Sequence, residues 1–253
     1  MQSVPEIRII GLPGIPEVRP GDDVARLILR AAESAACSFQ PGDVLVITHK
    51  VISKSEGRLV NLDDIVPSPF AAQYAERYGK DPRHVEVVLR ESARVVRMDR
   101  GLIIAENHLG FVCANAGVDA SNVPGAITVC LLPLDPDASA ARVRRTLSET
   151  LGFDIPVVIT DSFGRPWREG IVNIAIGVSG LAPLADYRGQ VDNHGLQLQA
   201  SVLAVADEIA AATELVMGKL EHVPVAIMRG YAYRSAEGSA RELRMDPSRD
   251  LFR

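Results

Sequence analysis

Three clusters of polar side chains each follow an apolar run of the sequence, and their residue types suit phosphate groups and divalent cations. The clusters are THKVISKSEGR from residue 48, ANAGVDASN from residue 114 and TDSFGRPWR from residue 160. In the first cluster, Lys50 and Lys54 carry the positive charge that attracts phosphate oxygens. Asp119 in the second cluster, with Asp161 and Ser162 in the third, offers the oxygen ligands that Mg²⁺ and Mn²⁺ prefer. Because a rigid strand fixes the residues that follow it, the pattern predicts a site for an anionic substrate and a metal ion.

The third cluster directly follows residues 157–160, an apolar run typical of a buried strand. The strand is expected to end where Asp161 begins the polar stretch. Gly164 is then expected to let the backbone turn closely. Arg165 and Arg168, which flank this turn, are expected to face anionic groups.

Each of these residues also has a purely structural interpretation when it is taken alone. Asp161 is suited to cap the turn after its strand, and Asp119 to cap a helix or an Asx-turn. Lys54 is typical of a solvated loop lysine, and Trp167 is more typical of packing than of substrate stacking. The functional interpretation is favoured by the joint pattern of three clusters rather than by any one residue.

Composition and motif spacing exclude several classes of protein. The chain has 253 residues and a net charge of -5, which argues against a nucleic-acid binder. No GxxxxGK[ST] loop and no GxGxxG fingerprint is present, so a P-loop NTPase and a Rossmann dinucleotide site are unsupported. The five histidines and three cysteines lack zinc-site spacing, and the cysteines are expected to be buried small hydrophobes. No signal peptide or membrane span is visible, so a cytoplasmic protein without a membrane partner is expected.

Hydrophobic spacing and turn residues predict the order of the elements. Helices are predicted within residues 22–36, 69–93 (two, broken at 79–82), 135–152 and 200–220. Strands are predicted at residues 7–10, 44–48, 93–98, 101–107, 110–117, 126–133, 156–160, 172–180, 184–190 and 223–230. Clustered strands with irregularly interspersed helices indicate an α+β fold with mixed or antiparallel sheets, with room for a large and a small subdomain.

The chain resembles the coenzyme F420-0:γ-glutamyl ligase family over nearly its whole length. The resemblance lies in the ordered motifs GIPEVRPGDD, GDVLVITHKVISKSEGR, ENHLGFVCANAGVDASNV, LLPLDPDASA, VVITDSFGRPWREG, VADEIAAATELVMGK and PVAIMRG. It implies the fold of that family and a ligase in which GTP activates the lactyl carboxylate of the deazaflavin coenzyme F420-0. L-glutamate is then joined to that carboxyl group through its amine, by way of an acyl phosphate, and further γ-linked glutamates are a possible continuation.

The same resemblance implies the residues of the site. The implied GTP-binding residues are Ile15, Pro16, Glu17, Val18, His49, Lys54, Asn122, Gly218 and Lys219. The implied metal ligands are Asp119, Asp161 and Ser162, and the implied catalytic residues are Asp119, Asp161 and Arg165. Two ions of Mg²⁺ or Mn²⁺ are expected, with K⁺ as a further candidate. The segment GLPGIPEV holds two copies of the loop motif, so contacts from Leu12 onward are the alternative to Ile15–Val18.

The resemblance also implies the organisation of the protein and its partners. A single ligase domain is expected over residues 1–253, without the C-terminal nitroreductase-like domain that some relatives carry, and a homodimer is expected. Two alternatives stay open from the sequence: a related GTP-dependent amide ligase that acts on a different acid, and a non-catalytic nucleotide-binding protein. The retained set of charged residues favours an enzyme over the second of these.

Overall fold

The structure is a computed structural model that describes residues 4–121, 125 and 127–250. Its helices are α1 (Val24–Ser34), α2 (His49–Ser55), α3 (Pro69–Tyr78), α4 (Pro82–Glu91), α5 (Pro136–Leu151) and α6 (Val205–Met217). Its strands are β1 (Arg8–Leu12), β2 (Val44–Thr48), β3 (Leu59–Asn61), β4 (Ser92–Asp99), β5 (Leu102–Asn107), β6 (Val112–Ala114), β7 (Thr128–Cys130), β8 (Val157–Arg165), β9 (Arg168–Ser179), β10 (Ala185–Asp186), β11 (Val202–Leu203) and β12 (Val225–Arg229).

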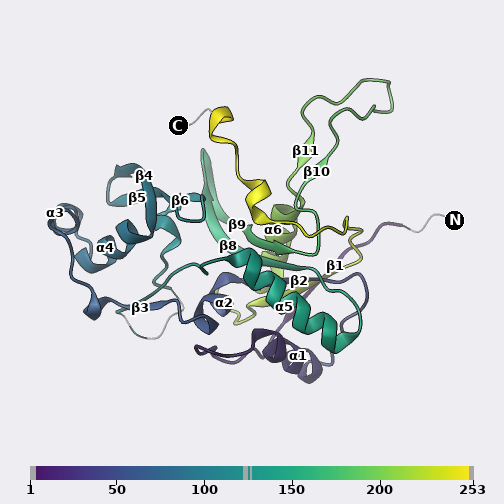
Figure 1. Cartoon of the computed structure of the whole chain (residues 1–253), viewed down its shortest axis with the longest axis horizontal. Coiled ribbons are helices and arrows are strands. Elements are labelled where there is room, and N and C mark those ends of the chain that lie inside the picture. The colour runs from purple at the N-terminus through teal and green to yellow at the C-terminus, as the bar shows by residue number, and fades with distance from the viewer. Residues whose placement is uncertain (1–3, 122–124, 126, 251–253) are drawn as a thin grey trace.

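A five-stranded mixed sheet with the order β1-β12-β2-β8-β9 forms the centre of the fold (Figure 1). Its neighbouring strands pair antiparallel except for β2 and β8, which run parallel. In that parallel pair Leu45 lies opposite Val157 and Thr48 lies opposite Thr160. The carboxyl end of β2 therefore lies beside the middle of β8, where Thr160 leads into Asp161.

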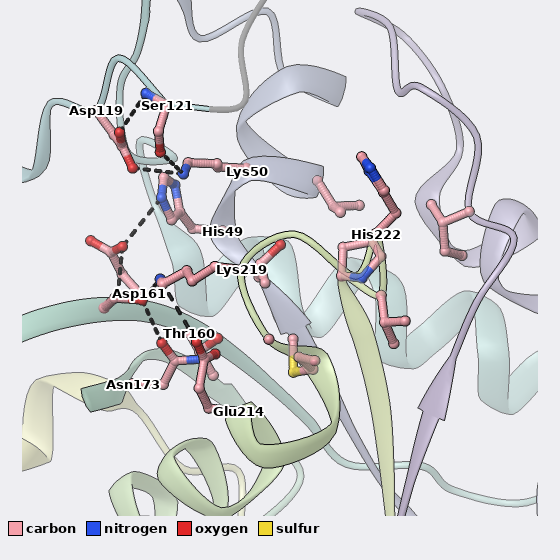
Figure 2. A pocket seen from close by; sticks show the side chains of 18 of the residues that line it. His49, Lys50, Asp119, Ser121, Thr160, Asp161, Asn173, Glu214, Lys219 and His222 are labelled. Atoms are coloured by element: carbon pink, nitrogen blue, oxygen red, sulfur yellow. Dashed lines mark hydrogen bonds and ion pairs between the residues drawn. The ribbon is translucent and has the colours of Figure 1, made fainter. Parts of the chain in front are cut away.

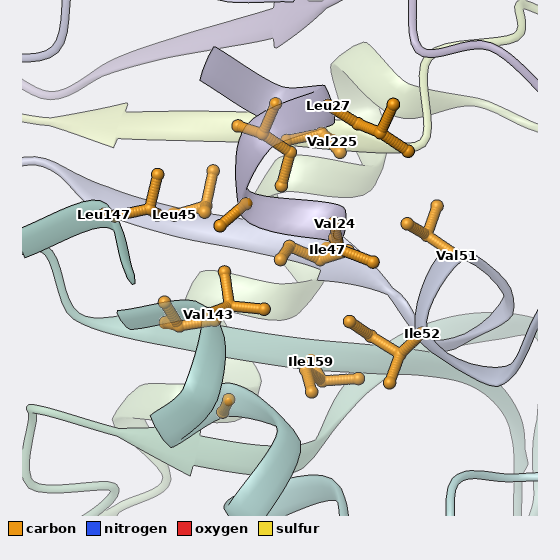
Figure 3. Close-up of a cluster of buried hydrophobic side chains, with 14 of the residues drawn as sticks. Val24, Leu27, Leu45, Ile47, Val51, Ile52, Val143, Leu147, Ile159 and Val225 are labelled. Carbon is orange, nitrogen blue, oxygen red and sulfur yellow. The ribbon is translucent and has the colours of Figure 1, made fainter. Parts of the chain in front are cut away.

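Both faces of this sheet are covered by helices, which explains the uninterrupted apolar run of β2. Successive side chains of a strand point to opposite faces, so Leu45 and Ile47 pack against α1 and α5 while Val44 and Val46 pack on the side of α6. Figure 3 shows the first of these two cores, in which Leu27 of α1 belongs to the same cluster as Leu45 and Ile47 of β2.

The edge strand β9 is protected by two helix carboxylates. Asp207 of α6 accepts a hydrogen bond from the backbone N–H of Ala175 at 2.9 Å, and Asp137 of α5 accepts one from that of Val178 at 2.8 Å. These N–H groups would otherwise offer an open edge for pairing with another chain. Burial raises the pKa of Asp207, and the hydrogen bond from Ala175 opposes that shift.

A smaller lobe with its own core lies beside the sheet, on the left of Figure 1. It contains α3, α4, the antiparallel sheet β4-β5-β6 and the antiparallel pair β3-β7. Val88 of α4 and Ala105 of β5 are fully buried in this third cluster. The lobe contributes Asp119 to the site, because the backbone of Asp119 pairs with that of Cys130 at the end of β7.

The α+β class predicted from the sequence is confirmed, and so are the helices within residues 22–36, 69–93 and 135–152. Several element predictions are wrong in part. The helix expected over 200–220 starts only at Val205, because residues 202–203 pair as β11 with β10. The strands expected at 110–117 and 184–190 are shorter in the structure, where they correspond to β6 and β10. The polar stretch after β2 forms a helix, α2.

The turn expected at Gly164 is also wrong. Strand β8 runs on through this glycine to Arg165, and the chain reverses at Pro166 and Trp167, where Trp167 has a φ of 57°. Arg165 and Arg168 then face each other across the start of the hairpin. A strand continues here because β9 pairs with the whole length of β8 and thereby satisfies its backbone.

Among the helices of residues 4–121, 125 and 127–250, none combines the length and the apolar composition that a membrane crossing requires.

A buried ion pair joins the first turn before β2 to the end of β12. Asp43 is fully buried, and both of its oxygens accept hydrogen bonds from the Arg229 guanidinium at 2.8 Å. The hydrogen bonds that Arg229 donates to this carboxylate raise the pKa of Arg229 above its usual value. The pair therefore fixes the two neighbouring strands β2 and β12 on the side opposite the site.

We expect the Asp43→Asn substitution to lower the free energy of unfolding by about 2–3 kcal/mol, because it removes the buried carboxylate that accepts two charge-assisted hydrogen bonds from the partly buried Arg229. Urea unfolding followed by circular dichroism measures the change. The matched control is Asp99→Asn, which breaks an ion pair with Arg97 whose side chains are both at least half exposed. The control is expected to change the free energy of unfolding far less, and equal effects at the two positions would contradict the assignment.

Candidate functional site

The in-register parallel pairing of β2 and β8 brings His49 and Asp161 together. His49 follows Thr48 and Asp161 follows Thr160, and these two threonines form the last pair between β2 and β8. The Nε2 atom of His49 lies 3.3 Å from the Oδ1 atom of Asp161, and His49 is almost fully buried. The Nδ1 atom of His49 lies 3.2 Å from the hydroxyl of Ser53, one turn further along α2. The imidazole ring is thus held on one side by its own helix and faces the carboxylate with the other.

A pocket of about 660 Å³ opens over these two residues. Its wall is formed by the N-terminal loop, one face of α2, the middle of β8, the first half of β9, the end of α6 and the loop that leads into β12. The lining residues include Ile15, Pro16, Glu17, Val18, His49, Lys50, Lys54, Asp119, Ser121, Thr160, Asp161, Ser162, Asn173, Glu214, Gly218, Lys219 and His222. The volume lies within the range typical of pockets for small-molecule ligands and cofactors.

Two lysines of α2 line the pocket, and each is paired with a carboxylate. Lys50 and Lys54 are four residues apart, so a helix places them on the same face. The Nζ atom of Lys54 lies 2.6 Å from Oε1 of Glu17. The Nζ atom of Lys50 lies 2.6 Å from Oδ2 of Asp119 (Figure 2). Lys50 also donates to the hydroxyl of Ser121 at 2.9 Å.

The Lys50 ammonium controls the charge state of Asp119. Burial by itself raises the pKa of this carboxyl, but the hydrogen bond and the charge of Lys50, with the backbone N–H of Ser121, outweigh that effect. The pKa of Asp119 therefore lies below its usual value, and the carboxylate form is favoured.

A second polar network lies on the other side of Asp161, where β9 and α6 meet. The hydroxyl of Ser162 donates to Oδ1 of Asn173 at 2.6 Å, and the amide nitrogen of Asn173 donates to the carboxylate of Glu214. The Lys219 ammonium donates to the same hydroxyl at 2.5 Å and lies 3.7 Å from Oε1 of Glu214. Figure 2 shows Asn173, Glu214 and Lys219 grouped next to Asp161.

The structure places almost all of the residues expected at the site around this one pocket. They are Ile15, Pro16, Glu17, Val18, His49, Lys54, Asp119, Asp161, Ser162, Gly218 and Lys219. Asn122 lies outside the described residues. Of the two loop copies, the one at Ile15–Val18 lines the pocket, and Leu12 is instead fully buried in the core.

Arg165 is the exception, and its expected contact with an anionic group stays a prediction. It does not line the pocket, because β8 carries it beyond Asp161 to the end of the hairpin. Its Nη2 atom donates to the backbone oxygen of Glu169 at 2.7 Å, so its side chain stabilises the hairpin itself.

The residues of the pocket fit a hard divalent cation that a phosphate helps to bind. Within the described part of the chain, no three side chains of histidine, cysteine, aspartate or glutamate converge as a metal site. Asp119, Asp161 and Ser162 nevertheless line the same cavity with oxygen donors. Mg²⁺ commonly takes one or two carboxylates and completes its shell with water and substrate phosphate. The donor set therefore suits a metal ion that enters with a phosphorylated substrate.

Sequence reasoning missed several polar residues of the pocket, namely Ser121, Asn173, Glu214 and His222. Asn173 had no signal in the sequence, because only the register of β8 and β9 sets it opposite Ser162. Glu214 and Lys219 are five residues apart around the end of a helix, and this proximity depends on the helix ending at Gly218. The four-residue spacing of Lys50 and Lys54 was a usable signal, but it required α2 to be recognised as a helix.

Comparison with known proteins finds similarity along the whole chain. Residues 14–230 match the family described as F420-0:Gamma-glutamyl ligase. A coenzyme F420:L-glutamate ligase of Methanopyrus kandleri is 50% identical over 258 residues, which cover 100% of both chains. A coenzyme F420:L-glutamate ligase of Methanothermobacter thermautotrophicus is 44% identical and covers 98% of this chain and 99% of its own. A third ligase of this name, from Methanocaldococcus jannaschii, is 39% identical over 98% of this chain and 97% of its own.

We expect the Lys50→Met substitution to raise the pKa of Asp119, because burial then acts without the opposing ammonium. A folded-state pKa below the unfolded value contributes stability above that value, which is lost as the pH falls through the folded pKa. The substitution should remove this contribution of Asp119. Carbon-13 NMR titration of the aspartate carboxyls measures the shift. The pKa of Asp81, which Arg83 lowers, serves as the control, and an unchanged Asp119 titration would contradict the coupling.

Proposed function

The chain belongs to the F420-0:γ-glutamyl ligase family, and from that membership we infer that it is a coenzyme F420:L-glutamate ligase, an acid–amino-acid ligase of coenzyme F420 biosynthesis. The observation that carries this conclusion is the sequence similarity to ligases of that name over the whole length of the chain. Its charged residues also line one pocket. We propose that the bond formed is an amide between the lactyl carboxyl group of F420-0 and the amine of L-glutamate.

We propose that GTP is the phosphoryl donor and that its phosphates lie against α2. The pocket holds the Lys50 and Lys54 ammonium groups, which are compact point charges suited to phosphate oxygens. In the structure each lysine pairs with a carboxylate, Asp119 or Glu17. A nucleotide that enters with a divalent cation can exchange these partners, so that the carboxylate meets the cation and the lysine meets phosphate. No charge is left unpaired in the exchange, which keeps its cost low.

Asp119 and Asp161 are the proposed metal ligands, with Ser162 as a neutral oxygen donor. When bound, Mg²⁺ or Mn²⁺ would offset the repulsion between the acceptor carboxylate and the γ-phosphate. A two-metal arrangement and an additional K⁺ ion are parts of the same proposal. His49 is expected to orient Asp161, because its Nε2 atom faces that carboxylate while Ser53 contacts its other ring nitrogen.

The proposed chemistry follows from the poor reactivity of a carboxylate toward an amine. An oxygen of the F420-0 carboxylate attacks the γ-phosphorus of GTP, and GDP leaves. The product is an acyl phosphate, whose carbonyl carbon is then attacked by the glutamate amine. Inorganic phosphate leaves with the carboxylate oxygen, and the attacking –NH₂ group loses one proton and keeps the other as the amide N–H.

A homodimer is proposed as the working assembly, and the arm formed by residues 185–203 supports it. This arm comprises β10, β11 and the segment between them, and it projects from the body (Figure 1). It exposes Tyr187, Val191, Leu196 and Leu203, of which Leu196 is 68% exposed. Apolar residues gathered on a projecting element are typical of an interface.

Turnover with defined substrates tests the proposed function. The protein is incubated with Mg²⁺ or Mn²⁺, GTP and L-glutamate, with and without F420-0, while GDP release and the mass of the product are followed. GDP release that depends on F420-0, with a product heavier by one or more glutamyl units, is expected. Turnover on another acid only would indicate a related amide ligase, and nucleotide binding without turnover on any acid would contradict the enzyme assignment.

We expect Asp161→Asn to leave the protein folded and to lower kcat/KM by about 100-fold or more, since losing a metal-ligand charge costs several kcal/mol of transition-state stabilisation. The melting temperature and the ligase rate at saturating Mn²⁺ are measured together. Asp64→Asn, at an exposed position of the small lobe, is the control for a changed carboxyl group. Near-normal turnover of the Asp161→Asn protein would show that this carboxylate is not a metal ligand.

Sedimentation at micromolar concentration is expected to give twice the 27.2 kDa mass of the chain. Leu196→Glu on the arm is expected to shift the protein toward the monomer, because it places a charge in the proposed contact. The control is Val66→Glu, at a position of the small lobe that is 80% exposed. A wild-type monomer, or equal behaviour of the two variants, would count against a dimer built on the arm.

A further inference from the structure

The hydroxyl of Ser162 lies at the end of a chain of hydrogen bonds that begins on α6. In the β8-β9 hairpin Ser162 lies directly opposite Asn173, and Asn173 reaches Glu214 of α6. Asn173 is only 2% exposed, so water cannot readily replace either of its partners. The orientation of its amide group is therefore decided by the protein.

We propose that Asn173 and Glu214 are positioning residues that hold the Ser162 hydroxyl with its lone pairs toward the pocket, so that Ser162 serves there only as an acceptor for a cation. This inference rests on the proposed function, in which Ser162 belongs to the cation site of the ligase.

The direction of donation along these hydrogen bonds is set at Glu214. A carboxylate accepts hydrogen bonds and has none to donate, so the NH₂ group of the Asn173 side chain must face it. The carbonyl oxygen of Asn173 is then turned toward Ser162. The serine has one hydroxyl hydrogen, and it donates this hydrogen to Asn173 at 2.6 Å.

The pocket side of the hydroxyl is consequently left with lone pairs alone. The contact seen there agrees with this polarity, because the Lys219 ammonium is a pure donor and lies 2.5 Å from the Ser162 oxygen. The ammonium marks the place that a divalent cation would occupy. A phosphate oxygen, which needs a donor, is disfavoured at the same point, so the network distinguishes cation from phosphate at the hydroxyl.

Reversal of the polarity tests the proposal. In Glu214→Gln the new amide can donate to Asn173, which lets the Asn173 amide turn over and point its NH₂ group at Ser162. The hydroxyl hydrogen then points into the pocket. The double variant Glu214→Gln with Asn173→Asp restores an acceptor opposite Ser162 and keeps the total charge of the pair, so it separates polarity from charge.

The affinity for Mn²⁺ is measured by isothermal titration with GDP held in fixed excess, so that phosphate oxygens complete the shell of the ion, and melting curves confirm folding. Glu214→Gln is expected to weaken Mn²⁺ binding about tenfold, the loss typical of one contact to a charged group. The double variant is expected to return to within about threefold of wild type. In a Ser162→Ala background, Glu214→Gln should have no further effect. Glu208→Gln, an exposed position of the same helix, is the charge control and should bind as wild type does.

Wild-type Mn²⁺ affinity in Glu214→Gln, an equal loss in the Ser162→Ala background, or a folded double variant that stays weak would each overturn the proposal. The F420-0 ligase assay of the wild-type protein is run in parallel. Normal ligation with an unaffected Glu214→Gln protein contradicts this inference alone. Absent ligation with the expected Mn²⁺ pattern contradicts the proposed function alone.

Discussion

The parallel pairing of β2 with β8 is the constraint on which the site depends. Antiparallel neighbours on either side leave these two strands at the centre of the sheet, with Val46 and Val158 fully buried. A shift of one residue would move every side chain of a strand to the opposite face, so the two buried faces specify the register strongly. Because Thr48 lies opposite Thr160, the residues that follow them, His49 and Asp161, lie side by side.

Charge pairing explains how an acidic chain can hold a pocket for anionic substrates. The lysines of α2 and the carboxylates Glu17 and Asp119 neutralise each other in pairs around the cavity. The pairs come from separate parts of the chain: the N-terminal loop supplies Glu17, the small lobe supplies Asp119, and α2 supplies both lysines. In the proposed function, a cation and a phosphorylated ligand would replace these contacts one for one, which would link ligand binding to the relative positions of the three parts.

The class of the fold and the clusters around Lys54, Asp119 and Asp161 could be predicted from the sequence because they rest on local signals, while the other predicted residues of the pocket were implied by the family resemblance. Apolar runs identified β2 and β8, and the polar residues at their ends pointed to the site. The errors have a common cause, since they concern features set by pairing between distant segments. Gly164 looked like a turn but lies within β8 because β9 pairs alongside it, and Arg165 was thereby carried out of the pocket. Asn173 became part of the site only through the hairpin register, which no local pattern encodes.

In the proposed mechanism, a phosphoryl group passes from GTP to the acceptor carboxylate before the amine attacks. Transfer of a carboxylate oxygen tests this step most directly. F420-0 labelled with ¹⁸O in its lactyl carboxyl group is incubated with GTP, Mn²⁺, L-glutamate and the protein, and the inorganic phosphate is analysed by mass spectrometry. The account predicts one ¹⁸O atom in each phosphate released. Amide formation with phosphate that carries no label would contradict it, because the carboxylate oxygen would then never have been bonded to phosphorus.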